Sequence, residues 1–175
     1  AATLKPRRFR CKDKAGLAAL RETIPASARY DWKQMTEALA AEKPWWQPGT
    51  KHGYHALTFG YLVGEVLRRI DGRTLGAYFR DELAGPLGLD FWIGFGPELD
   101  ARVAEMIPAP PTPPGVANPF AAAARDPESL VGRTFGNPVI ETGAVNTRAC
   151  RAAEIPAANG HGTARGLARI YGALA

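Results

Sequence analysis

The chain has 175 residues, of which 46% are hydrophobic and 22% are charged, a balance typical of one globular domain. It contains no apolar run near the roughly 18 residues of a membrane-spanning helix, and no apolar signal-peptide core follows its basic start, so we expect no membrane partner and a cytoplasmic location. Two cysteines, Cys11 and Cys150, are too few for a disulfide framework or a metal site and predict two reduced thiols.

The net charge of +5 is confined to the N-terminus. Seven basic residues and only Asp13 among the acidic ones lie within residues 1–21, so this stretch carries +6 and the remaining 154 residues sum to −1. Such a run is usually a solvated tail, and Phe9 is the only aromatic residue in it. We therefore treat residues 1–14 as a basic arm and do not expect a nucleic-acid partner.

The first predicted helix follows Asp31, which can cap a segment with apolar positions at Trp32, Met35, Thr36 and Leu39. It leads into Trp45-Trp46, where an extended approach is closed by a turn at Pro48-Gly49.

Two further amphipathic helices are predicted after this turn. In the first, an apolar stripe recurs at helical spacing and Gly72 ends the helix; in the second, Gly85-Pro86 stops the helix. The stripes are Leu57, Tyr61, Leu62, Val66 and Ile70, then Leu75, Tyr78, Phe79 and Leu83. Gly60 and Gly64 inside the first helix each cost about 1 kcal/mol against alanine, which predicts that another backbone packs closely there.

The second half of the chain is predicted to be irregular with short elements. The segment 91–95 favours a strand, 97–106 fits a helix or a strand, and the prolines of 108–119 predict an extended crossing. Segments 121–124 and 126–130 favour helix, and Thr163 can cap a last helix to Ala175.

One set of motifs resembles a known family. Trp46-Gln47-Pro48-Gly49, Tyr54, a Gly60-x-x-x-Gly64-Glu65 helix and Pro86-Leu87-Gly88-Leu89 together resemble the serine β-lactamase and penicillin-binding-protein superfamily, closest to class C β-lactamase-like esterases. The similarity runs from about Ala15 to the end, and it implies a turn at Asn159-Gly160, where related chains carry an N-G turn. Upstream only Gly16-Leu17 matches, so residues 1–14 are hypothesised to be foreign to the domain 15–175.

This resemblance implies a catalytic role for Tyr54. In the family a Y-x-N motif or its variants stands at this place; here Tyr54-His55-Ala56 lacks the Asn, which the resemblance associates with ester rather than β-lactam hydrolysis. The family's nucleophile is the Ser of S-x-x-K, whose proton a Lys and the Tyr move together. A serine hydroxyl is a weak nucleophile without such a base.

The other parts of that site do not match. Neither Ser27 nor Ser129 begins S-x-x-K, and Cys11-Lys12-Asp13-Lys14 reads C-x-x-K by coincidence. His161-Gly162-Thr163 looks like the family's third motif but is interpreted as a decoy, since it precedes a helix whereas the motif lies on a strand expected beyond residue 175.

The resemblance therefore implies the middle of a longer enzyme. The expected fold is mainly α with one or two short strands. It is the helical part of an α+β fold most of whose antiparallel sheet is missing, and its uncovered apolar faces favour self-association.

Two functions stay open. The first is a serine esterase fragment that acts on small-molecule esters once completed but is inactive alone. The second is a non-catalytic remnant or a helical binding module with a basic arm. Likewise, Tyr54 is either a catalytic residue or a packed tyrosine at a helix start, and Trp45 and Trp46 either line a cleft or only pack. No cofactor is expected, and His52 and His55 lack a third metal ligand.

Overall fold

The computed structural model describes residues 30–110, 112–113, 115–126, 128–136 and 143–174. These residues form a mainly helical structure with one two-stranded antiparallel sheet, which confirms the expected fold class. The predicted basic arm, Cys11 and Ser27 lie outside the described residues. Within the described part, no helix has both the length and the apolar character to cross a membrane.

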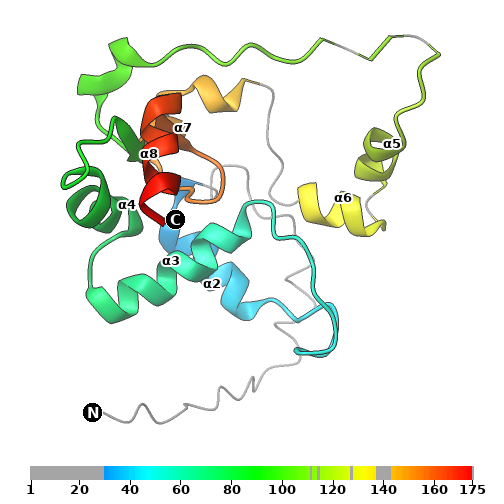
Figure 1. Cartoon of the computed structure of the whole chain (residues 1–175). Helices are drawn as coiled ribbons and strands as arrows, with labels where there is room; N and C mark the ends of the chain where they lie inside the picture. The colour runs from blue at the N-terminus through cyan, green and yellow to red at the C-terminus, as the bar shows by residue number, and fades with distance from the viewer. Residues whose placement is uncertain (1–29, 111, 114, 127, 137–142, 175) are drawn as a thin grey trace.

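The elements fall into a larger helical group and a separate pair, α5 and α6, which lie together at one side of the molecule (Figure 1). In chain order they are α2 (Trp32–Ala41), α3 (Thr58–Asp71), α4 (Leu75–Phe79), the π-helical turn η2 (Arg80–Ala84), β1 (Phe91–Ile93), the 3₁₀ turn η3 (Pro97–Arg102), α5 (Pro119–Arg125), α6 (Leu130–Phe135), the 3₁₀ turn η4 (Ala144–Asn146), α7 (Arg148–Ala152), β2 (Gly160–Gly162) and α8 (Ala164–Leu174).

The helix boundaries follow local chemistry. Asp31 caps α2 by accepting a hydrogen bond from the Gln34 N–H at 2.9 Å, and Gly72 ends α3 in the left-handed region at φ 91°. Thr163 caps α8 through the Gly166 N–H at 3.0 Å. These three predictions are confirmed.

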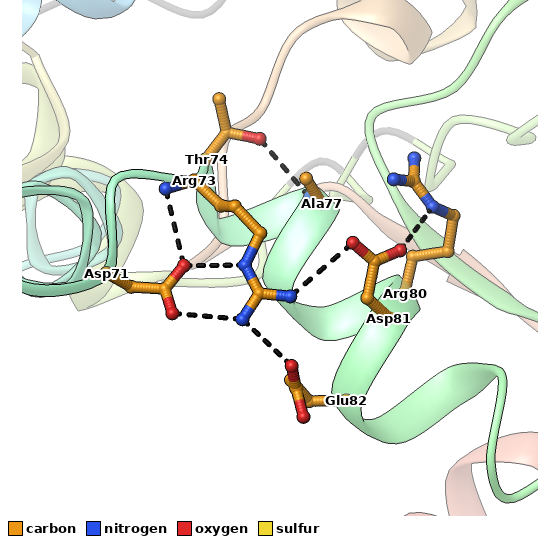
Figure 2. Close-up of polar contacts among 7 residues, drawn as sticks. All are labelled: Asp71, Arg73, Thr74, Ala77, Arg80, Asp81 and Glu82. Carbon is orange, nitrogen blue, oxygen red and sulfur yellow. Dashed lines mark hydrogen bonds and ion pairs between the residues drawn. The ribbon is translucent and has the colours of Figure 1, made fainter.

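Arg73 fastens the connection between α3 and α4. Its guanidinium lies between Asp71 at 2.6 Å, Glu82 at 2.8 Å and Asp81 at 3.5 Å (Figure 2). The hydrogen bond from Arg73 lowers the pKa of the Asp71 carboxyl. Because these side chains are partly exposed, the cluster orients the α3–α4 corner more than it stabilises the fold.

The core is small and centred on two side chains. Met35 of α2 and Tyr61 of α3 are 0% and 1% exposed, and the Trp32 ring lies 5.1 Å from that of Tyr61. Cys150, Ala153 and Ile155 complete the buried cluster. Burial raises the pKa of the Tyr61 phenol, and fully burying an apolar side chain is worth about 1.5–3 kcal/mol.

The two glycines of α3 are crowded by different partners. A Cβ at Gly60 would lie 2.5 Å from the Ala157 backbone nitrogen, as predicted for a close backbone. The prediction is wrong for Gly64, where the side chain of Trp32 occupies the space. The small residue at that position makes room for a large ring.

The sheet joins two distant segments. Phe91, Trp92 and Ile93 pair with Gly162, His161 and Gly160, so the predicted strand in 91–95 is confirmed over three residues. The predicted turn at Asn159-Gly160 is wrong, because Asn159 is buried and Gly160 begins β2. Asn159 instead closes the preceding loop: it donates to the carbonyls of Cys150 and Ala153 and accepts from the Ile155 N–H.

Other segments also differ from expectation. The range 97–106 begins with the 3₁₀ turn η3. The helix predicted over 126–130 is wrong for Asp126, Glu128 and Ser129, because α6 starts only at Leu130. In α3, the C-terminal half of the predicted apolar stripe is exposed, with the Val66 side chain at 58% and the Ile70 side chain at 78%. Neighbouring elements therefore bury only the N-terminal turns of α3. Self-association through such faces stays a prediction.

Candidate functional site

Tyr54 stands at the surface, on the loop between α2 and α3. Its side chain is 72% exposed, and its ring lies 6.1 Å from that of Phe135 on α6. Within the described residues no hydrogen bond engages its hydroxyl. The packed alternative for Tyr54, with a satisfied hydroxyl, is therefore not what the structure shows.

The loop that carries Tyr54 is held on both sides. The Trp46 indole donates to the Lys51 carbonyl at 3.0 Å, and its ring packs so tightly on Gly53 that a Cβ there would lie 2.6 Å from Trp46 Cη2. Beyond Tyr54, His55 Nδ1 lies 2.8 Å from the Thr58 hydroxyl at the start of α3. Tyr54 is thus bracketed by anchored neighbours while its own hydroxyl is left available.

Tyr54 borders a hollow of about 400 Å³ between this loop, α2, α3 and α6, which we call the aromatic pocket. Trp45 and Trp46 line it, with their rings 6.5 Å apart and nearly perpendicular. The Arg133 guanidinium of α6 lies 3.9 Å from the centre of the Trp45 ring. Both tryptophans thus line a hollow among the described residues, and their place in the cleft of a longer enzyme stays a prediction.

The one serine in the described part of the chain does not line the aromatic pocket. This residue, Ser129, is the N-cap of α6: it accepts from the Gly132 N–H at 2.8 Å and donates to the Asp126 carbonyl at 2.9 Å. Across the described ranges, no group of three or more His, Cys, Asp or Glu residues is placed to hold a metal ion. Of the two sequence candidates, His52 and His55, only His55 lines the aromatic pocket.

His161 belongs to a different hollow. It lies on β2, with Nδ1 2.7 Å from the Asn159 carbonyl and its ring edge-on to Phe95, and it lines a cavity of about 500 Å³ that does not include Tyr54. The prediction is that the family's third motif lies on a strand, whereas His161-Gly162-Thr163 only precedes a helix. That contrast is wrong, because His161-Gly162 is itself on a short strand and still precedes α8.

Sequence reasoning missed Arg133 and Phe135. Both lie on a six-residue helix far along the chain from the Trp-rich loop, and ring and guanidinium contacts join the helix to that loop. The capping serine before Leu130 signals the helix start, but no local pattern signals which surface the helix covers.

The comparisons with known proteins agree with this arrangement. A family model described as Beta-lactamase matches residues 12–175. The chain is 39% identical over 173 residues to the esterase/beta-lactamase LipL of Mycobacterium tuberculosis (strain ATCC 25618 / H37Rv), covering 94% of this chain and 38% of LipL.

Solved structures give the same relationship. A family VIII carboxylesterase superposes with a TM-score of 0.74 at 38% identity, over 92% of this chain and 40% of that one. EstA from Arthrobacter nitroguajacolicus Rue61a gives 0.67 at 33% identity, over 90% and 41%. A penicillin-binding protein homologue from Caulobacter crescentus gives 0.62 at 37% identity, over 91% and 42%. The chain spans about two fifths of the length of these relatives. With its family model matched from residue 12 onward, this chain belongs to the β-lactamase family.

Proposed function

We propose that this chain is the helical part of a serine hydrolase that cleaves small-molecule esters, with Tyr54 as the residue that accepts the serine proton. The observation that carries the proposal is the position of Tyr54. It is exposed at the rim of the aromatic pocket, its hydroxyl is unengaged among the described residues, and the chain resembles proteins described as esterases.

The chemistry needs partners from other segments. A phenol has a pKa near 10, so serving as a base at pH 7 takes a shift of about 3 units, or about 4 kcal/mol. In this family the S-x-x-K lysine lies beside the tyrosine and supplies positive charge, and its serine supplies the nucleophile. No S-x-x-K occurs in the 175 residues. We therefore propose that this chain alone does not hydrolyse esters.

The first test is p-nitrophenyl butyrate hydrolysis by the purified chain. The expected result is no rate above buffer from protein that shows a folded helical spectrum. Turnover by the chain alone would contradict the need for an external serine.

The second test is a chimera in which residues 30–175 replace the matching segment of the family VIII carboxylesterase. Tyr54→Phe in this chimera should lower kcat about 10²- to 10⁴-fold, because it removes the proton acceptor and little else. The matched control is Tyr171→Phe on α8, a side chain 67% exposed that lies outside the aromatic pocket. Equal activity of the two variants would remove Tyr54 from the mechanism.

A further inference from the structure

The aromatic pocket combines apolar walls with three charged side chains, none of which makes an ion pair within the described residues. Trp45, Trp46 and Leu62 form part of the lining, while the charged side chains along it are Glu42, Lys43 and Arg133. The lining therefore carries a net positive charge. A concave apolar site with few polar groups is the usual form of a small-molecule site.

The helical arginines of this fold are of two kinds: some pair with carboxylates, whereas Arg125, Arg133, Arg165 and Arg169 make no ion pair within the described residues. Arg68 and Arg69 pair with Glu65, and Arg148 and Arg151 pair with Asp100. Arg133, in contrast, makes no ion pair within the described ranges, although Glu42 lines the same pocket.

The Trp45 ring fixes where the Arg133 charge lies. The guanidinium carbon is 3.9 Å from the ring centroid, a cation–π distance. A guanidinium held by a ring face keeps its N–H donors for a carboxylate, which it can bind in a bidentate manner. Arg133 is thus placed at the pocket as an anion-binding group.

From these features we infer that the aromatic pocket binds an aromatic or branched apolar group that bears a carboxylate, with the tryptophans against the apolar part and Arg133 against the carboxylate. A volume of about 400 Å³ suits this ligand class, since a cavity of about 150 Å³ already accepts benzene. The inference rests on the proposed function only in taking this ligand as part of the ester substrate, which would then be an ester with a free carboxylate.

The experiment measures binding to the whole chain by calorimetry and tryptophan fluorescence, with two probes of the same shape. The charged probe is 3-phenylpropanoate and the neutral probe is 3-phenylpropanamide. The carboxylate should bind in a saturable manner with a Kd of about 1 mM, and the amide about tenfold more weakly, because hydrogen bonds to charged groups are the stronger ones. Equal affinity of the two probes, or no saturable binding of either, would overturn the inference.

Variants locate the site. Arg133→Gln should weaken 3-phenylpropanoate binding about tenfold and leave the amide unchanged, whereas Arg169→Gln, an exposed arginine on α8, should change neither. Trp45→Ala should weaken both probes and reduce the fluorescence response. An Arg133→Gln variant that binds both probes as the unmodified chain does would refute the assigned role of Arg133.

The result of the binding experiment does not depend on the result of the esterase tests. Binding of these probes requires no serine, so it can be measured on a chain that does not turn over esters. If the Tyr54→Phe chimera stays active while the binding pattern holds, the catalytic proposal fails and the inference about the pocket stands. If the Tyr54→Phe chimera loses activity while the two probes bind with equal affinity, the inference about the pocket fails and the catalytic proposal stands.

Discussion

Gly60→Ala tests the closest contact in the fold. A Cβ at this position would lie 2.5 Å from the Ala157 nitrogen and 3.0 Å from Pro156 Cδ, distances at which something must move. The obstacle at Ala157 is backbone, so it cannot rotate away. Overpacking of this kind costs about 1–3 kcal/mol, against about 1 kcal/mol gained in helix propensity. We expect a net loss of up to about 2 kcal/mol in the free energy of unfolding.

The same substitution at Gly172 is the matched control. Gly172 lies within α8, where no atom stands within 4 Å of the added Cβ. Gly172→Ala should therefore raise stability by up to about 1 kcal/mol through helix propensity alone. The two variants share one chemical change and differ only in what surrounds it.

Urea unfolding followed by circular dichroism measures both variants. The midpoint should fall for Gly60→Ala and rise for Gly172→Ala, with the slope m unchanged. A Gly60→Ala variant as stable as Gly172→Ala would refute the argument, since it would show that α3 and the loop at 156–157 do not touch.

Two further predictions concern polar groups. Asn159→Ala removes three buried hydrogen bonds to backbone groups and should cost about 2–4 kcal/mol in thermal or urea unfolding, while Asn146→Ala, whose bonds to backbone are exposed, should cost about 1 kcal/mol or less. The hydrogen bond from Trp32, with those from two arginines, lowers the pKa of Glu65 to about 2, so its contribution is complete above about pH 4.5 and is lost as the pH falls towards 2. Glu65→Gln should therefore be about 1 kcal/mol less stable at pH 6 and converge with the unmodified chain near pH 2; a constant difference in urea unfolding across this range would contradict the assignment.

Features set by adjacent residues could be predicted from the sequence. The capping roles of Asp31 and Thr163 and the left-handed end at Gly72 depend on side chains and backbone within four residues. The strand at Phe91–Ile93 was predicted from its β-branched and aromatic content. Local chemistry thus fixes most of the element list.

Features set by distant contacts could not be predicted in detail. The close packing at Gly60 and Gly64 was anticipated, but the sequence does not reveal that a ring rather than a backbone fills the space at Gly64. Asparagine is a residue type that favours turns, yet the buried hydrogen bonds of the Asn159 side chain close a loop instead. Tertiary hydrogen bonding here overrides the local turn preference.

The candidate site divides in the same way. Tyr54 was identified because motif residues around it lie close in sequence, and the anchors that hold its loop, Trp46 on Gly53 and His55 on Thr58, are also local. Arg133 comes from a helix that reaches the loop only through the folded chain, so its contact with Trp45 has no sequence signature. The proposed proton acceptor can therefore be read from the chain, whereas the group inferred to choose its ligand requires the fold. Changes at Arg133 should alter which esters are bound without moving Tyr54.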